Sequence, residues 1–474
     1  MNAKRREKAF IVETLWITKR IYSGYLLIYI VLKLIILVNM TLINQNKIKA
    51  REDLLVLFID MNSFFASCEQ QDNFWLRGRP VGVCVYTGKH GCVIAPSIEA
   101  KKKGVKTGMR LDEAISLCPD LVPLETKPER YRNYHKKIME VLRRHAQDVI
   151  PKSIDEAVIN LRGYKLIYPD PAVLARKIKL EIKQEIGDWL RCSIGIAPNA
   201  FLAKLASNLK KPDGLETINP ENIDKVLSGL SLRDLPGIGQ GMEERLNRAG
   251  ITSPLQLRYT PSDKLRRACK SILGEYWHKR LNFAEVDLMT HSYSSMQAMR
   301  QLSREQRISK EHRESLLIAL CMKLERRMLQ QKVYCQELAC YTKYGAGGNW
   351  KAKVRLTQPL QDGNALLKII QDKMKQYEQI HVGDKLLNPD LRALCVYVSD
   401  FIPEDQLQYH LFEDEVKNGK LRRLQFDINQ RYGSHTLIRA TELSHGRVLR
   451  DAIGFGSVKD LTALDDKSSE VVSW

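Results

Sequence analysis

Leu54-Leu-Val-Leu-Phe-Ile-Asp60 is an apolar run that ends in a carboxylate. A short run of this kind is typical of a central strand that is buried on both faces of a sheet. A charged side chain at the end of such a strand is costly unless it meets a cation or another partner. The run therefore predicts a layered domain with an acidic functional site where this strand ends.

A second acidic pair, Asp155-Glu156, lies in a predicted turn between strands 148–150 and 157–161. Carboxylates on neighbouring strands can hold two divalent ions ~3.5–4 Å apart, an arrangement that serves phosphoryl transfer, and oxygen ligands suit Mg²⁺. Adjacent strand residues face opposite sides, so both acids reach one site only if the turn redirects one of them. The alternative, for an isolated Asp-Glu pair, is an ordinary turn or capping acid.

Strands and helices alternate around these acids, which indicates an α+β sheet with helices on one face. The main predicted helices of this block are 127–145, 171–186 and 199–209, and its last strand is 191–197. The chain becomes helical from about residue 219. A second α+β block runs from Tyr293 to about Phe401, and a polar tail follows from Pro403.

The chain is strongly basic, with a formal net charge of +20 over 474 residues. This balance favours a polyanionic partner, nucleic acid first and an anionic membrane second, over a purely structural protein. The ten cysteines form no CxxC pair and lie in apolar stretches. Such cysteines are typical of buried free thiols in a reducing compartment, so the sequence predicts a cytoplasmic protein without a zinc site.

Residues 1–50 differ from the rest, because basic residues precede a mostly apolar segment from Ile21 to Ile43. That segment is long enough to span a bilayer. A membrane anchor would place the thiols and a nucleic-acid substrate outside the cell. We therefore expect residues 1–50 to be a loosely attached or artefactual extension, with translation starting at Met40, and a membrane partner is not expected.

Five motifs occur in one order along the chain: Leu57-Phe-Ile-Asp-Met-Asn-Ser-Phe-Phe-Ala-Ser-Cys-Glu69, Glu99-Ala-Lys-Lys-Lys-Gly-Val105, Ser153-Ile-Asp-Glu-Ala157, Ser193-Ile-Gly-Ile-Ala197 with Ala203-Lys-Leu-Ala-Ser-Asn-Leu-Lys-Lys-Pro-Asp-Gly214, and Leu235-Pro-Gly-Ile-Gly239. Each motif alone is weak to moderate evidence for a protein family, but the order and spacing of all five together are highly specific. The chain resembles the Y-family translesion DNA polymerases of UmuC/DinB type, with the UmuC branch closest, over roughly residues 54–450.

The resemblance implies an α+β right-hand architecture with a palm, small fingers, a helical helix–hairpin–helix thumb and an α+β little finger. The expected boundaries are 1–50 for the N-terminal extension, 51–62 and 128–218 for the palm, 63–127 for the fingers, 219–290 for the thumb, 291–402 for the little finger, and 403–474 for a tail with a clamp-binding motif.

The resemblance also implies the catalytic residues. The metal ligands of the family carry over to Asp60, Asp155 and Glu156, with the backbone carbonyl of Met61 as a further ligand. Together they are expected to hold two Mg²⁺ ions.

Four further residues are expected at the nucleotide. Phe65 falls at the steric-gate position, where an aromatic ring closes the space that a ribose 2′-hydroxyl needs. Phe64 beside it is grouped with the nucleotide site, although core packing is its simpler interpretation. Lys211 matches a phosphate-contacting lysine, and Lys101 stands where many relatives carry an arginine. The chain departs from the DinB-like pattern at two phosphate-binding positions, which hold Ala95 and Ile98 in place of Thr and Tyr.

Gly237 and Gly239 lie in a loop that resembles half of a helix–hairpin–helix, where glycines let the backbone approach a DNA phosphate. Gln408, Leu411 and Phe412 resemble the pentapeptide with which bacterial polymerases bind the sliding clamp. The alternative for these three residues is a short element that packs on the little finger. The expected partners are primer–template DNA, deoxynucleoside triphosphates and the sliding clamp, and an accessory subunit is a further candidate that the sequence alone does not decide.

The function that the resemblance implies is error-prone translesion DNA synthesis in DNA repair and the SOS response. Two alternatives remain at this point. One is a catalytically silent DNA- and clamp-binding protein that keeps the fold, against which the intact Asp60, Asp155 and Glu156 argue. The other is a palm-type nucleotide cyclase, which does not account for the thumb motif or the second α+β block.

Overall fold

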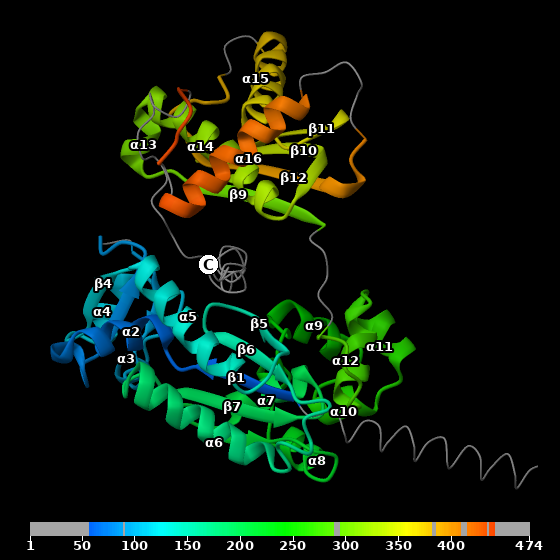
Figure 1. The fold of residues 1–474 in the computed structure, drawn as a ribbon. Helices are drawn as coiled ribbons and strands as arrows, with labels where there is room; N and C mark the ends of the chain where they lie inside the picture. The colour runs from blue at the N-terminus through cyan, green and yellow to red at the C-terminus, as the bar shows by residue number, and fades with distance from the viewer. Residues whose placement is uncertain are drawn as a thin grey trace, which may run out of the picture. The chain divides into compact units, whose positions relative to one another are not determined.

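The computed structural model describes residues 56–88, 91–288, 294–381, 385–408, 415–433 and 436–440 (Figure 1). The chain folds as two compact units that divide at residue 289. Within the described ranges, no helix is both long and apolar enough to cross a membrane. The segment from Ile21 to Ile43 lies outside these ranges.

A five-stranded sheet forms the centre of the first unit, with strand order β5-β6-β1-β7-β8. The predicted central strand is its middle strand, β1, which pairs antiparallel with β6 and with β7 and is buried along its whole length (Figure 1). The strands are β1 (Val56–Met61), β5 (Val149–Pro151), β6 (Glu156–Asn160), β7 (Cys192–Ala197) and β8 (Leu215–Thr217).

Helices cover both faces of this sheet, so the expectation of helices on one face was wrong. Because side chains alternate along a strand, Leu57 and Ile59 of β1 face one core, and Val56 and Phe58 face another. The first core contains α5 (Pro128–Arg143) and α6 (Pro171–Glu181), which continues into a π-helical turn, η2 (Ile182–Ile186). The second core contains α7 (Ala200–Leu209).

The predicted fingers form a small subdomain around a three-stranded sheet of order β3-β2-β4. Helix α2 leads into it directly from the end of β1. The elements are α2 (Phe64–Asp72), η1 (Phe74–Leu76), β2 (Val81–Cys84), β3 (Val93–Pro96), α3 (Ile98–Lys102), α4 (Leu111–Leu117) and β4 (Val122–Glu125).

The helical block follows β8 and packs around the buried indole of Trp277, in the same core as α7. Its elements are α8 (Ile223–Ser228), η3 (Leu232–Asp234), α9 (Gln240–Arg248), α10 (Pro254–Tyr259), α11 (Ser262–Cys269) and α12 (Leu273–Leu281).

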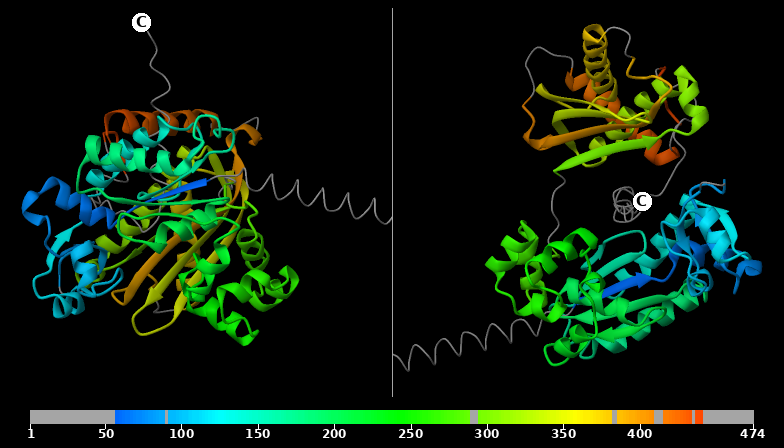
Figure 2. Two further views of the ribbon diagram at one scale, coloured as in Figure 1. Left: turned by 90° about the horizontal axis from the view of Figure 1, so that it is seen from below. Right: turned by 180° about the vertical axis from the view of Figure 1, so that it is seen from behind.

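The second unit is a four-stranded antiparallel sheet of order β11-β10-β12-β9, whose long strands lie side by side in the left view of Figure 2. Strand β9 and helix α16, which falls in the predicted polar tail, were not foreseen. The elements are β9 (Ser295–Gln301), α13 (Arg304–Ile308), α14 (Lys310–Gln330), β10 (Val333–Tyr344), β11 (Asn349–Leu360), α15 (Gly363–Ile380), β12 (Leu391–Pro403), η4 (Glu404–Gln406) and α16 (Glu415–Tyr432).

Helices α14 and α15 share one core with the sheet of the second unit, so one sheet face is covered. Along β11 the alternate residues Lys351, Lys353 and Arg355 are exposed, because they belong to the opposite face. Each of the two units thus combines a sheet with packed helices, and the predicted α+β fold class is confirmed.

Candidate active site

Asp60 lies near the end of β1, directly across from Glu156 on the neighbouring strand β6. It is the one charged residue of the otherwise apolar strand β1, and it is only 7% exposed. The ammonium of Lys211, which follows α7, lies 2.6 Å from its carboxylate. The cost of burying this acid is therefore offset by a cation from the segment after α7.

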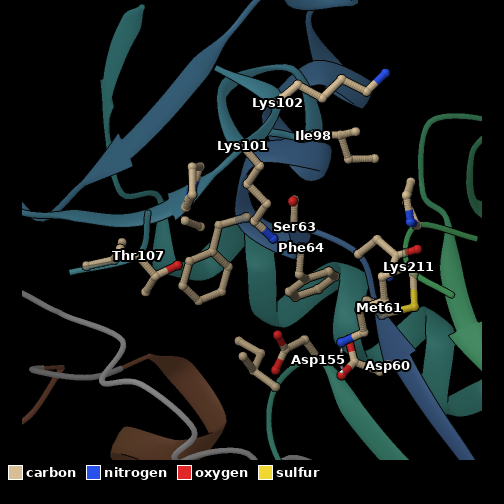
Figure 3. Close-up of a pocket in the computed structure, with 17 residues that line it drawn as sticks. Asp60, Met61, Ser63, Phe64, Ile98, Lys101, Lys102, Thr107, Asp155 and Lys211 are labelled. Carbon is tan, nitrogen blue, oxygen red and sulfur yellow. Dashed lines mark hydrogen bonds and ion pairs between the residues drawn. The ribbon is translucent and has the colours of Figure 1, made fainter. Parts of the chain in front are cut away.

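Asp155 lies in the turn between β5 and β6, one residue before β6 begins. The N–H of Met61 donates to its backbone carbonyl at 2.9 Å, so the turn is attached to the end of β1. Because Asp155 precedes the strand, strand alternation does not constrain its side chain. Asp60, Met61 and Asp155 line one cavity of about 490 Å³ (Figure 3).

Glu156 does not line this cavity. As the first residue of β6 it faces α7, and both of its carboxylate oxygens accept from Lys204 of that helix at 2.9 Å. Two of the three predicted carboxylate ligands therefore line the cavity, as does Met61, whereas the third carboxylate is paired with Lys204. Lys204 was not foreseen as a partner, although it belongs to the motif Ala203–Gly214.

Burial raises the pKa of Asp60 to about 6, although Lys211 lowers it and the charges of Glu156 and Asp155 add to the rise. Burial also raises the pKa of Asp155, to whose carboxylate the Ser153 hydroxyl donates. A nearby cation would therefore stabilise the charged form of these two carboxylates.

The donor set in the cavity consists of carboxylate oxygens, which suit a hard divalent cation such as Mg²⁺. No group of three or more Asp, Glu, His or Cys side chains is gathered for a metal in the described part of the chain. Asp60 and Asp155 would hold such an ion, and Glu156 would join them only after leaving Lys204.

Three lysines line the cavity, and two of them point into it, whereas Lys102 points away (Figure 3). Lys101 projects from α3 into the space in front of α2, and Lys211 reaches it from beyond α7 (Figure 3). Burial lowers the pKa of Lys101, and the charge of Lys211 lowers it further. Both lysines that the sequence singled out thus reach the same cavity, where an anion would relieve their repulsion.

Asn62 holds the segment that carries Lys211. Its side-chain oxygen accepts from the Asp213 N–H at 2.7 Å, and its amide donates to the Ser193 hydroxyl at 3.1 Å. That hydroxyl also accepts from the Gly214 N–H at 3.2 Å. A motif on β1, one on β7 and one after α7 are therefore joined by hydrogen bonds, a link that sequence spacing alone does not reveal.

Phe65 lines the cavity, and its ring stacks on that of Tyr131 at a centroid distance of 4.3 Å. The Tyr131 hydroxyl donates to the buried carboxylate of Glu69 at 2.9 Å, and Arg130 pairs with the same carboxylate at 2.6 Å. Helices α2 and α5 are thereby locked together behind the Phe65 ring. The sequence placed Tyr131 only on an apolar helix face, since the stacking partner lies far away in the chain. Phe64 also borders the cavity but is 2% exposed and belongs to the core.

Gly237 and Gly239 lie immediately before α9, as expected for a loop between helices. Gly237 has a φ of 86°, which favours glycine, and Gly239 precedes the first residue of α9 without a side-chain cap. Free N–H groups at this helix start suit a phosphate. Of the predicted clamp residues, Gln408 is exposed after η4, whereas Leu411 and Phe412 lie outside the described residues.

Two family models match the chain. The impB/mucB/samB family matches residues 59–208, and the impB/mucB/samB family C-terminal domain matches residues 293–411. The first match contains the acids of the cavity, and the second contains the four-stranded sheet of the second unit. Together they cover more than half of the chain.

Several curated proteins and solved structures are similar to it. The DNA polymerase IV of Pelotomaculum thermopropionicum is 28% identical over 84% of this chain and 98% of its own length. The DNA polymerase IV of Xanthomonas euvesicatoria is 36% identical over 44% of this chain and 58% of its own length.

Among solved structures, a Y-family DNA polymerase chimera superposes with a TM-score of 0.61 at 24% identity, covering 74% of this chain and 99% of that chain. An insertion ternary complex of Dbh DNA polymerase gives a TM-score of 0.52 at 23% identity, with the same coverage. These two likenesses concern the fold alone, and they agree with the predicted right-hand architecture. Together with the family models and the relatives, they show that the chain belongs to the Y-family of translesion DNA polymerases.

Proposed function

We propose that this Y-family polymerase extends a DNA primer past damaged template bases with Asp60 and Asp155 as catalytic carboxylates, assisted by Glu156. The observation that carries the proposal is the cavity itself. It combines the buried Asp60 of β1 and the half-buried Asp155 of the β5–β6 turn with three lysines, Lys101, Lys102 and Lys211. Acids suit divalent cations and lysines suit a triphosphate, so one cavity provides for both.

The acids and the lysines of the cavity would have separate roles. Asp60, Asp155, Glu156 and the Met61 carbonyl would hold two Mg²⁺ ions, which stabilise the charge that develops on the reacting oxygens when bound. Lys101 and Lys211 would bind the triphosphate as point charges. Lys211 now bonds to Asp60, so it would exchange this carboxylate for phosphate oxygens once cations neutralise the acid.

Primer extension tests the proposal. The wild-type chain is given primer–template DNA, with and without a lesion in the template, together with Mg²⁺ and the four deoxynucleotides. We expect extension on both templates. A chain that binds this DNA but adds no nucleotide to either primer would be a silent relative, and the proposal would fail.

Phe65→Ala is expected to admit ribonucleotides, because it removes the ring that closes the cavity beside the sugar. We expect selection against the ribose to fall by about a hundredfold, the order at which shape alone discriminates between substrates, while deoxynucleotide use is largely kept. The measurement is kcat/KM for each dNTP and its ribose counterpart.

Phe64→Ala is the matched comparison, since Phe64 is the neighbouring aromatic of α2 and belongs to the core. It should lower the thermal stability but leave the sugar ratio close to that of the wild type. Unchanged discrimination in Phe65→Ala would make Phe65 a core residue as well.

The open sheet face of the second unit suits DNA. Lys351 lies 5.3 Å from the Tyr341 ring, and Lys353 and Arg355 follow it along β11. These side chains are exposed on the face that no helix of the shared core covers. Lysine and arginine bind phosphates without regard to sequence, as a polymerase requires. We infer that this face contributes to the binding of primer–template DNA.

DNA affinity is expected to fall steeply with salt. Each neutralised phosphate releases counterions, so a protein that neutralises roughly six to ten phosphates loses about 10³–10⁵ in affinity between 50 and 200 mM salt. Binding to primer–template DNA is measured by fluorescence anisotropy at several salt concentrations. Replacing Lys351, Lys353 and Arg355 with Gln should reduce the slope by about 0.9 for each phosphate that the variant leaves without a cation. A flat salt response would contradict a backbone-led interface.

The finer role of the enzyme is also part of the proposal. We infer error-prone synthesis in the SOS response, based on the resemblance to the UmuC branch, and a place of action in the cytoplasm. All ten cysteines are free thiols, as a reducing compartment favours. We further infer binding to the sliding clamp through Gln408, Leu411 and Phe412, and to an accessory subunit.

A further inference from the structure

His135 lies on α5, one helical turn after Tyr131, and only 3% of it is exposed. Its Nδ1 atom lies 2.8 Å from the backbone carbonyl oxygen of Ile154, which is the residue before Asp155. Because a carbonyl oxygen only accepts hydrogen bonds, Nδ1 carries the proton and donates it. A side chain of α5 therefore holds the turn from which Asp155 reaches the cavity.

The turn between β5 and β6 also has bonds of its own. Two backbone N–H groups at its start donate to the Glu156 carbonyl at 2.9 and 3.2 Å. The bond from the Met61 N–H to the Asp155 carbonyl joins the turn to β1. None of these bonds reaches the carbonyl of Ile154, to which His135 donates. His135 thus gives the turn a further support, from a helix of the first core.

The bond from His135 acts on Asp155 through a single peptide group. The carbonyl of Ile154 and the N–H of Asp155 belong to the same planar unit, so fixing the oxygen fixes the orientation of the Asp155 backbone. The N–H of this unit donates to the Ser153 hydroxyl at 3.3 Å, and that hydroxyl donates to the Asp155 carboxylate. Both polar atoms of the peptide group are therefore bonded, and one of the partners belongs to a helix that does not line the cavity.

A carboxylate that binds a metal depends on support of this kind. A misplacement of about 1 Å can cost on the order of a hundredfold in rate. Losing a partner that orients a metal ligand typically costs about 10–100-fold in metal affinity or activity. Tyr131 supports Phe65 from the same helix by stacking on its ring. Helix α5 thus supports both the predicted steric gate and the turn that carries Asp155.

We propose that His135 is a positioning residue, whose ring donates Nδ1–H to the Ile154 carbonyl and so holds the Asp155 carboxylate in place for a divalent cation. The inference rests on the proposed function, in which Asp155 is a catalytic carboxylate, and it adds a residue outside the cavity. His135 contacts neither the cation nor the nucleotide in this role. Its loss should therefore weaken the metal site while triphosphate binding is kept.

The first test compares the Mg²⁺ affinity of His135→Asn and His135→Leu with that of the wild type. The amide nitrogen of asparagine takes the position of Nδ1 and donates in its place, whereas leucine fills space without a donor. Calorimetry measures the Kd of Mg²⁺ for the chain in complex with a dNTP and a primer–template whose primer lacks the 3′-hydroxyl. We expect His135→Leu to weaken this affinity by about 10–100-fold and His135→Asn to restore most of it.

Single-turnover primer extension gives the second readout. The maximal rate of His135→Leu should fall by about 10–100-fold, and its Mg²⁺ dependence should shift to higher concentration. The apparent Kd for dNTP at saturating Mg²⁺ should stay close to that of the wild type, because Lys101 and Lys211 do not belong to the turn.

His145→Leu is the matched control. His145 is a second buried histidine, whose ring bonds to Glu181 at 2.8 Å, and it does not line the cavity. This variant should lower the unfolding temperature, as His135→Leu does, but leave the rate and the Mg²⁺ dependence unchanged. The comparison separates a loss of stability from a loss of positioning.

Wild-type Mg²⁺ affinity and rate in His135→Leu would overturn the proposal. A folded His135→Asn that is as impaired as His135→Leu would overturn it too, because the packing of the ring rather than its donor would then matter. If His135→Leu does not fold, His135→Gln takes its place, since its longer side chain moves the amide away from the Nδ1 position. Equal Mg²⁺ affinities of the Asn and Gln variants would then refute the role of the donor. A wild-type chain that extends no primer refutes the polymerase function instead, and the Mg²⁺ affinities still decide the role of His135.

Discussion

Asp155→Ala is expected to slow primer extension by at least about a thousandfold without unfolding the chain. The half-buried carboxylate of Asp155 lines the same cavity as Asp60, and partial burial raises its pKa. Holding a divalent ion against the reacting phosphate is worth several kcal/mol, and each 1.36 kcal/mol is tenfold in rate. Single-turnover extension of a primer on an undamaged template measures the loss.

Thermal stability and DNA affinity should not fall in this variant, in contrast to the rate of extension. Removing this partly desolvated acid relieves its repulsion from Asp60 and Glu156, so Asp155→Ala should unfold at the same or a higher temperature. Its affinity for primer–template DNA should not fall. Asp148→Ala is the matched control, because Asp148 is an exposed acid beside β5 and does not line the cavity. Near-normal extension by Asp155→Ala would contradict the assignment of Asp155 as a metal ligand.

Asp60→Ala and Glu156→Ala extend this test to the other two predicted ligands. Asp60→Ala should abolish extension. Glu156→Ala should abolish it as well if Glu156 turns from Lys204 to the metal when nucleotide binds. Lys204→Ala separates the two roles of Glu156, because it removes the lysine with which Glu156 now pairs. If Glu156→Ala retains extension while Asp155→Ala does not, Glu156 is a structural partner of α7 and two acids carry the chemistry.

Leu411→Ala combined with Phe412→Ala is expected to weaken binding to the sliding clamp by about 10²–10⁴-fold. Full burial of a Leu or Phe side chain contributes roughly 1.5–3 kcal/mol each, and each 1.4 kcal/mol is tenfold in affinity. The clamp would tether the enzyme and raise its effective concentration at the primer end without new contacts to DNA. Surface plasmon resonance on immobilised clamp measures the loss.

Extension assays complete the clamp test. The double variant should extend short primed templates like the wild type without clamp, and it should lose the stimulation that added clamp provides. Tyr409→Ala is a suitable control, since Tyr409 is an aromatic within the pentapeptide that the motif does not require. Normal stimulation of the double variant would make the segment a packing element of the little finger.

Local sequence was sufficient for the central strand and for the acids at its end. Leu54–Asp60 predicts a buried strand with an unpaired charge, because an apolar run of that length needs a covered sheet and its carboxylate needs a cation. The turn before β6 was predictable because apolar strands flank it on both sides, but only Asp155 lies in it, since Glu156 is the first residue of β6. The order of the five motifs then indicated the right-hand fold, which the family models support.

Tertiary structure decided which of these groups meet. Glu156 pairs with Lys204, Lys211 with Asp60, and Phe65 with Tyr131, and all three pairs join residues from separate elements. Such contacts depend on strand register and on the helix that covers each sheet face, and neither is encoded in local spacing. The placement of α7 opposite α5 and α6 follows from the alternation of two buried faces on β1. By itself the sequence determined the central strand and the acids and lysines that carry the chemistry, whereas packing determined which side chains reach the cavity, because burial selects contacts between residues that are distant in the chain.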